Sequence, residues 1–292
     1  MACCAARVWS EFLYQRLSIV VLGSTEAQWE ALMDVTTEFR PGKYAIVTIQ
    51  KEPVNSMDYA LWSKLLDVLD ALENDQSVRG AVFLSGLKKN IFTAGNDIRE
   101  LYAPKTSLER YKRFWVTQNV FLARLYRSRL MTVAAIRGAC PAGGCVLSLC
   151  CDHRVMTDFG TIGLNEVALG IPVPTLWAKM MSHTLGTGVA YGLLHEAKLL
   201  SPQQALSVGL VDEIVSKEEL QARAEAWLQK MLQLPDDGRA VTKLRMRKEL
   251  SMELEDGAEA EAEEAWTYLE QPQIVKVLGA VLQRLSGGRA RL

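Results

Sequence analysis

The sequence lacks the features that mark several large classes of protein. Its 292 residues contain no apolar run close to the roughly 18 residues that a membrane-spanning helix requires, so we expect no membrane span. Its 33 Lys and Arg residues nearly balance 34 Asp and Glu residues, for a net charge of −1. Because nucleic-acid binding needs a concentrated basic surface, we expect no nucleic-acid partner. Internal repeats and low-complexity linkers are also missing, which favours one large domain.

The chain has no C-x-x-C pair, although it has six cysteines. Four of them, Cys140, Cys145, Cys150 and Cys151, lie in the stretch CPAGGCVLSLCCDHR. If 145–151 is helical, a spacing of five residues turns the side chains apart by about 140°, so Cys145 and Cys150 diverge, which argues against a shared metal ion. Six cysteines in so long a chain are also not typical of a disulfide scaffold. We therefore predict neither a metal site nor disulfides, and we interpret these cysteines as small buried apolar residues.

Apolar periodicity predicts alternating strands and helices in the first part of the chain, which is typical of an α/β fold. The predicted strands are 41–50, 79–84, 132–136 and 152–156, and the predicted helices are 58–73, 107–128 and 144–151. After about residue 175 the pattern is mainly helical, at 175–185, 202–207, 217–233, 238–251 and 258–270, with a short strand at 210–215.

This pattern suggests three regions. Residues 1–40 are expected to be an N-terminal extension, residues 41–215 a core that holds the functional site, and residues 216–292 a helical part that serves oligomerisation. The segment 252–266 in the third region carries seven acidic residues, and we interpret it as a solvated helix face.

The segment FTAGNDI, residues 92–98, is a candidate ligand-binding loop. Ala94 and Gly95 are small enough for a ligand to approach the backbone closely. Asn96 and Asp97, ahead of Ile98, suit a turn or a helix start. A plain loop that caps a helix would have the same sequence, so this segment alone does not decide between the two readings.

The glycine pair Gly143–Gly144 stands directly before the apolar helix predicted at 144–151. The first N–H groups of a helix lack internal partners and lie at the positive end of the helix dipole. Such a helix start can stabilise a developing negative oxygen, and one N–H from each of the two loops would form an oxyanion hole. Close packing of helix on strand is the alternative reason for glycine here.

Glu166 lies in the mostly apolar stretch TIGLNEVALGIP, residues 161–172. Partial desolvation should raise the pKa of its carboxyl, so that it can both take and return a proton. A capping or surface glutamate is the competing interpretation. Asn165 is either a residue that orients Glu166 or the substrate, or a turn residue.

Together these three segments resemble the crotonase (enoyl-CoA hydratase/isomerase) superfamily, over about residues 40–250. The AGND loop matches the A-G-x-D loop of that family, and the resemblance implies oxyanion donors at the N–H groups of Asn96 and Gly143. It implies a catalytic acid–base at Glu166, 23 positions after Gly143. The segment EPVNSM, residues 52–57, resembles the family segment along the coenzyme A adenosine. Residues expected near the substrate are therefore Val54, Asn55, Ala94, Gly95, Asp97, Ile98 and Asn165.

Within the superfamily, PVNS, CPAGGC and IGLNE-x-x-LGI are most similar to the Δ3,Δ2-enoyl-CoA isomerase branch. Hydratases of the family carry a second glutamate three residues after the donor glycine, where this chain has Val146. The resemblance implies a spiral of ββα units with a helical C-terminal part, and an isomerase acting on 3-enoyl-CoA in β-oxidation of unsaturated fatty acids. It implies no cofactor beyond the coenzyme A of the acyl-CoA substrate, no metal, and a homotrimer or hexamer.

Three other functions stay open. They are enoyl-CoA hydration, another acyl-CoA reaction on the same fold, and a non-catalytic member that binds coenzyme A or RNA. The near-neutral charge argues against RNA, and the presence of Glu166 argues against loss of catalysis.

The two ends of the chain suggest different compartments. The ending Ala290-Arg291-Leu292 resembles the small-basic-leucine peroxisomal address. Residues 1–25 contain Arg7 and Arg16 with one acidic residue, Glu11, which is a weak mitochondrial transit pattern. We expect a peroxisomal or a mitochondrial matrix protein.

Overall fold

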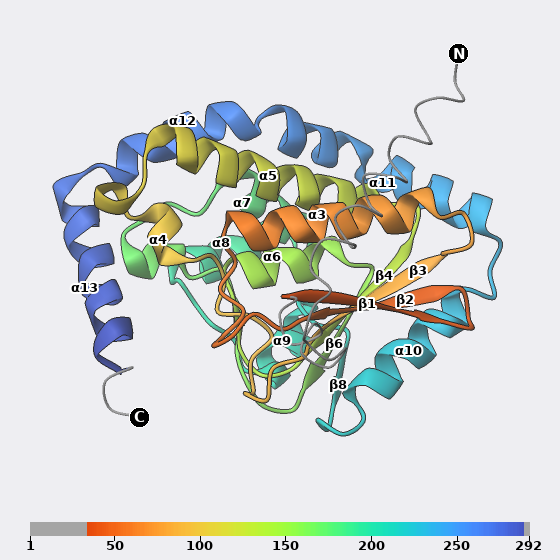
Figure 1. The fold of residues 1–292 in the computed structure, drawn as a ribbon. Helices are drawn as coiled ribbons and strands as arrows, with labels where there is room; N and C mark the ends of the chain where they lie inside the picture. The colour runs from red at the N-terminus through yellow and green to blue at the C-terminus, as the bar shows by residue number, and fades with distance from the viewer. Residues whose placement is uncertain (1–33, 289–292) are drawn as a thin grey trace, which may run out of the picture. The chain divides into compact units, whose positions relative to one another are not determined.

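The structure is a computed structural model, and it describes residues 34–288. In this part of the chain a six-stranded mixed sheet has the strand order β1-β2-β3-β4-β6-β8 (Figure 1). Strands β1 and β2 are antiparallel, and all other neighbours are parallel. A separate parallel pair is formed by β5 and β7. The strands are β1 (Val35–Arg40), β2 (Tyr44–Ile49), β3 (Gly80–Ser85), β4 (Met131–Ile136), β5 (Cys140–Pro141), β6 (His153–Thr157), β7 (Ile162–Gly163) and β8 (Glu213–Val215).

The helices fall into those that follow strands of the core and those of the C-terminal part. The former are α3 (Tyr59–Asn74), α4 (Ile98–Leu101), η1 (Ala103–Lys105), α5 (Leu108–Arg127), α6 (Gly143–Cys150), η2 (Glu166–Leu169), α7 (Thr175–Leu185), α8 (Thr187–His195) and α9 (Pro202–Val208). The latter are α10 (Leu220–Met231), α11 (Asp236–Asp256), α12 (Ala258–Leu269) and α13 (Pro272–Gly288).

The sheet is covered on both faces, which explains why its inner strands are almost continuously apolar. Side chains of successive strand residues point to opposite faces. In β2, Val47 and Ile49 pack in the larger cluster with α3 and α5, whereas Tyr44 and Ile46 pack in the smaller cluster with α10. Figure 1 shows α3 and α5 on one side of the sheet and α10 on the other.

The C-terminal helices extend the layer over α5. Helices α11 and α12 pack along α5, and α13 packs against α4 and η2 (Figure 1). No helix within residues 34–288 is long and apolar enough to cross a membrane. The arrangement brings α12 and α13 to the same end of the sheet as the loops at 92–98 and 161–172.

The elements predicted between residues 41 and 174 are found within a few residues of their expected bounds. Helix α3 begins after Asp58, whose side chain accepts a hydrogen bond from the N–H of Leu61, as its place in the sequence suggested. Helices α8 and α13 were missed. Helix α8 contains Gly188 and Gly192, which have poor helix propensity, so tertiary packing outweighs local preference there.

The boundary predicted at residue 41 needs correction. Strand β1 lies inside the expected extension, and Val35–Arg40 pairs residue by residue with β2 across a tight turn. The turn signal at 41–43 therefore belongs to a hairpin rather than to a boundary. The remaining part of the expected extension, residues 1–33, lies outside the described residues.

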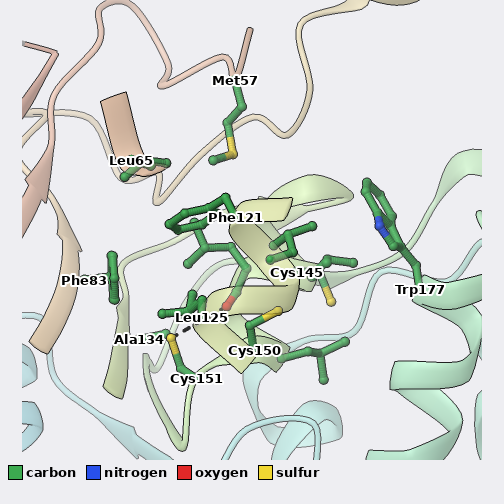
Figure 2. Packing of buried hydrophobic residues seen from close by; sticks show 14 of the residues in the cluster. Met57, Leu65, Phe83, Phe121, Leu125, Ala134, Cys145, Cys150, Cys151 and Trp177 are labelled. Atoms are coloured by element: carbon green, nitrogen blue, oxygen red, sulfur yellow. Dashed lines mark hydrogen bonds between the residues drawn. The ribbon is translucent and has the colours of Figure 1, made fainter. Parts of the chain in front are cut away.

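The cysteines near α6 are part of the hydrophobic core, as predicted. Figure 2 shows Cys145, Cys150 and Cys151 among Phe121, Leu125, Ala134 and Trp177. All three thiols are fully buried and free, and burial raises their pKa. No group of three or more residues suited to hold a metal ion occurs within residues 34–288.

Candidate active site

A cavity of about 730 Å³ lies in the described part of the chain. Its walls come from distant parts of the sequence: the loop 51–56, the loop 94–99, the start of α6, the segment 165–175, and helices α5, α12 and α13. Of the predicted substrate-binding residues, five line it: Val54, Ala94, Asp97, Ile98 and Asn165.

The AGND loop lies directly against the start of α6. Gly95 has a φ of +81°, a left-handed conformation that favours glycine. A Cβ at this position would lie 3.0 Å from the carbonyl oxygen of Pro141 and 3.6 Å from the nitrogen of Gly143. The small residue is needed both for the backbone conformation and for the close approach of the two loops. Gly95 and Gly143 stand behind the lining residues Asn96 and Ala142.

Two backbone N–H groups at this junction have no acceptor among residues 34–288. Asp97 N–H donates to Met57 O at 3.0 Å, and Met57 N–H donates to Gly95 O at 2.9 Å, which fixes the loop but leaves the N–H of Asn96 without a partner. The N–H of Gly143, in the first turn of α6, also lacks a partner. The structure therefore brings together the two N–H groups that the sequence predicted as a pair of donors.

The side chain of Asn96 has a role that the sequence did not indicate. Its Oδ1 accepts a hydrogen bond from Trp62 Nε1 at 3.2 Å, and Trp62 is fully buried. A Cβ on Gly143 would lie 2.8 Å from the same oxygen. The amide thus fills the space beside Gly143, anchors the loop to α3, and explains why Gly143 carries no side chain.

Glu166 is the first residue of η2 and is only 9% exposed. Neither of its carboxylate oxygens has a hydrogen-bond partner among the described residues, and the side chain lines the cavity. Burial raises its pKa to about 7, which confirms the rise expected from its apolar neighbours. Near neutral pH both protonation states are populated, so the carboxyl can accept and return a proton.

Val146, which stands where hydratases carry a second glutamate, is fully buried in α6. It belongs to the main hydrophobic cluster and carries no ionisable group. Val146 therefore supplies no carboxyl at this position of α6.

Asn55 does not line the cavity, unlike the other member of its predicted pair, Val54. It is fully buried, and its Nδ2 donates to Ile49 O, Ser85 Oγ and Phe92 O at 3.1, 3.1 and 2.8 Å. These bonds tie the loop 51–56 to β2, β3 and the loop at 92. Asn55 supports the wall of the cavity from behind, which corrects the expectation that it contacts substrate.

Asp97 lines the cavity but also caps α4, because its side chain accepts a hydrogen bond from the N–H of Arg99. Burial opposes its ionisation, but hydrogen bonds and charge from Arg99 lower its pKa overall. Three cations, Lys51, Lys89 and Arg99, also line the cavity, and the sequence analysis did not single them out. Their separation along the chain gave no motif.

The other end of the cavity has walls that the sequence analysis missed. Aromatic residues Tyr111 and Trp115 come from α5 and Trp177 from α7, and the rings of Trp115 and Trp177 stack at 5.5 Å. Glu261, in the segment predicted to be a solvated helix face, lines the same cavity. Its Oε2 accepts a hydrogen bond from Trp115 Nε1 at 3.2 Å, and burial raises its pKa. Two glutamates of the segment predicted to face solvent, Glu261 and Glu264, therefore line the cavity.

The family model for enoyl-CoA hydratase/isomerase matches residues 41–281. The chain belongs to the enoyl-CoA hydratase/isomerase family. Among curated members, mouse mitochondrial enoyl-CoA delta isomerase 1 is 37% identical over 247 residues, covering 84% of each chain. The human protein of the same name is 35% identical over 243 residues, covering 82% of this chain and 80% of the relative.

Solved structures of the family have the same fold. The crystal structure of human mitochondrial delta3-delta2-enoyl-CoA isomerase matches with a TM-score of 0.84 at 34% identity, over 88% of this chain and 99% of that one. Enoyl-CoA hydratase from Bacillus halodurans matches with a TM-score of 0.78 at 27% identity, over 85% and 100% of the two chains. The α/β crotonase fold with C-terminal helices is thereby confirmed, and family membership makes this protein an acyl-CoA enzyme.

Proposed function

We propose that this protein is a Δ3,Δ2-enoyl-CoA isomerase, which converts 3-enoyl-CoA to trans-2-enoyl-CoA in β-oxidation of unsaturated fatty acids. The observation that carries the proposal is one unpaired, buried carboxyl at Glu166, in a cavity where two unpaired N–H groups meet. The similarity to isomerases of mouse and human, over four-fifths of the chain, supports it.

In the proposed reaction the thioester carbonyl oxygen lies between the N–H groups of Asn96 and Gly143. These donors, with the positive end of α6, stabilise the negative charge that develops on the oxygen when a C2 proton leaves. Because both N–H groups lack acceptors among residues 34–288, no protein hydrogen bond must break before substrate binds. The thioester is the electron sink, so this reaction needs no metal or redox cofactor.

Glu166 takes the C2 proton, and the electron pair of that C–H bond becomes part of a dienolate that extends over the oxygen, C1, C2, C3 and C4. Glu166 then returns a proton to C4, and the double bond that remains joins C2 and C3. A pKa of about 7 suits both steps, because the same carboxyl must act as base and as acid. Asn165, the neighbouring lining residue, is proposed to orient the substrate.

The substrate's coenzyme A is proposed to lie along Val54, Ala94 and Ile98, with Lys51, Lys89 and Arg99 available to its phosphates. The acyl chain then extends toward Tyr111 and Trp115 under α12 and α13. This places the reacting carbons between the polar loops and the apolar end of the cavity, beside Glu166.

Hydration of 2-enoyl-CoA is the second candidate, because a hydratase of known structure shares the fold. Val146 argues against it, since water addition on this scaffold uses a second carboxyl that valine cannot supply. We expect the protein to convert 3-hexenoyl-CoA, followed by growth of the conjugated enoyl absorbance, much faster than it hydrates crotonyl-CoA. Equal rates would assign the hydratase function, and no reaction with either substrate would assign a binding role.

The substitution Val146→Glu sharpens this choice. A second carboxyl close to Glu166 raises the pKa of one of the two and leaves one acid and one base. We expect detectable hydration of crotonyl-CoA, slower isomerisation, and a loss of stability of a few kcal/mol from the buried carboxyl. Val146→Leu, which adds volume without charge, is the control. Hydration that is no faster in Val146→Glu than in this control would contradict the assigned role of the position.

We also propose a homotrimer or hexamer. The supporting observation is a set of exposed apolar side chains on and after α8 and α9, which includes Val189, Tyr191 at 69% exposed, Leu199 and Leu206. Light scattering of wild type and Tyr191→Asp tests this, and a monomeric wild type would contradict it.

Either organelle suits the proposed reaction. The two predicted targeting signals fall within residues 1–33 and 289–292, which lie outside the described part of the chain. A fluorescent reporter carrying either end, followed by microscopy, tests the compartment.

A further inference from the structure

A second cavity of about 710 Å³ lies on another part of the molecule and shares no lining residue with the first. It is formed where α11 crosses the ends of α5, α6 and α7 and the starts of β4 and β6. Its apolar wall includes Met131, Leu149, Leu234 and Met246. Nothing in the proposed isomerisation uses this cavity.

Cations dominate the polar wall of this second cavity. Arg154, Arg239, Lys243 and Arg247 line it, together with His183. Among the described residues that line it, Asp152 is the one carboxylate. Its two oxygens accept from Lys243 at 2.8 Å and from Arg247 at 3.0 Å, so it is shared between two cations.

The carboxylates behind the wall do not balance this charge. Arg154 pairs with Asp212 at 2.7 Å, and Arg239 pairs with Asp236, which also pairs with Arg79 at 2.6 Å. The four cations of the wall, Arg154, Arg239, Lys243 and Arg247, therefore meet three carboxylates, and one of these, Asp236, is shared with Arg79 outside the wall. Positive charge is left in excess in a partly desolvated place, where a missing counter-charge costs most.

Several of these guanidinium N–H groups also lack acceptors. Nε and Nη1 of Arg239 are buried without a hydrogen-bond partner among residues 34–288, and so is Nε of Arg154. Buried cationic donors without acceptors are unfavourable, and these guanidinium groups gain charge-assisted hydrogen bonds if they turn toward an anion in the cavity. The planar guanidinium matches phosphate oxygens in a two-point contact.

We propose that this second cavity binds a phosphoryl group, as free phosphate or as the phosphate of a small monoester whose body contacts the apolar wall. A phosphate dianion supplies the negative charge that the ion pairs leave unmet, and its oxygens accept from the guanidinium groups of Arg239 and Arg154. The site is independent of the proposed isomerisation, because the two cavities share no wall residue.

The test is calorimetric titration of the full chain with inorganic phosphate and with phenyl phosphate, in a buffer free of other phosphates. Wild type is expected to bind one equivalent, and Arg239→Gln is expected to bind at least about tenfold more weakly, since it loses charge-assisted hydrogen bonds. Tighter binding of phenyl phosphate assigns the monoester, and equal binding assigns free phosphate.

One control removes the same charge elsewhere. Arg223 is exposed, pairs with Glu213 and lines neither cavity. Arg223→Gln is expected to bind like wild type. A second variant, Met246→Glu, places a negative charge at a 66% exposed position of the wall and should repel the anion without disturbing the core. The proposal is overturned if wild type shows no binding, if Arg223→Gln weakens binding as much as Arg239→Gln, or if a folded Met246→Glu binds like wild type.

Discussion

Glu166 lines the first cavity and Asp152 lines the second, and the two carboxyl groups have opposite surroundings. Glu166 is 9% exposed, and the side chain of Asp152 is also 9% exposed. Glu166 has no hydrogen-bond partner among the described residues, whereas Asp152 accepts from Lys243 and Arg247 and from the N–H of Thr132. Equal burial therefore does not give equal chemistry, because the partners decide whether the charged form is stabilised.

The difference teaches how to separate a reactive group from a structural one. A carboxyl that must gain and lose a proton needs burial without a cation, since a cation would hold it in the charged form. A carboxylate that holds elements together needs cations on both oxygens, and Asp152 joins β4, β6 and α11 in this way. Glu261, half-buried and accepting a hydrogen bond from Trp115, stands between the two cases.

The largest effect is expected from Glu166→Gln, which keeps the shape of the side chain and removes the base. Isomerase turnover should fall by about 10²–10⁴-fold, the range for loss of general acid–base catalysis. Turnover of 3-hexenoyl-CoA by folded protein, checked by circular dichroism, measures it. Activity close to wild type would assign the proton transfer to another group.

Asp152→Asn should damage the fold rather than the chemistry. It leaves Lys243 and Arg247 without their shared counter-charge, and breaking such a buried pair costs about 3–5 kcal/mol. Urea unfolding measures the free energy, and the exposed ion pair of Lys179 with Glu253 provides a control in Glu253→Gln, expected to change it by less than about 1 kcal/mol. If both substitutions lowered the free energy of unfolding equally, burial of the ion pairs of Asp152 would not contribute to stability.

The stability of the protein should also depend on pH through Glu166. Its pKa rises from an ordinary value of 4.5 to about 7 on folding, so the folded state holds the proton to higher pH. The contribution of Glu166 to the free energy of unfolding is therefore fully present below pH 4.5. It is lost as the pH rises through about 7, which lowers the free energy of unfolding by about 3 kcal/mol. The difference in unfolding free energy between wild type and Glu166→Gln, measured across this window, should shift by that amount. A difference that stays constant with pH would mean that Glu166 is not desolvated.

The smallest effect is expected from Glu261→Gln, in the same cavity as Glu166. Glutamine keeps an acceptor for Trp115 Nε1, so stability should change by no more than about 1 kcal/mol. Turnover should change by less than about threefold, far from the range for a general base. A loss of turnover as large as that of Glu166→Gln would mean that the absence of partners does not distinguish the catalytic carboxyl.

Local sequence was sufficient where the chemistry depends on residue type and close spacing along the chain. Gly95 and Gly143 are needed for backbone conformation and close approach, and both needs appear in the sequence as small residues next to a helix start. The apolar stretch around Glu166 also indicated its burial, and this residue is only 9% exposed in the fold.

Residues that act through distant partners were not predictable in this way. Asn55 was expected at the substrate, but its amide bonds to β2, β3 and the loop at 92 turn it inward. Glu261 was expected in solvent, but α12 packs on α5 and brings it to Trp115. The sequence around each residue carries no record of a partner 30 to 150 positions away.

By itself the sequence indicated the α/β class, the two loops proposed to supply N–H donors, the acid–base candidate Glu166 and the burial of the cysteines. These follow from short-range rules: the period of apolar residues, the space that glycine leaves, and the effect of apolar neighbours on a charge. Only the tertiary structure decided the length of the first cavity, the aromatic wall and Glu261 at its end, and the unequal ion pairs around Asp152. Those features depend on which elements meet in space, and that is set by packing of the whole core rather than by any one segment.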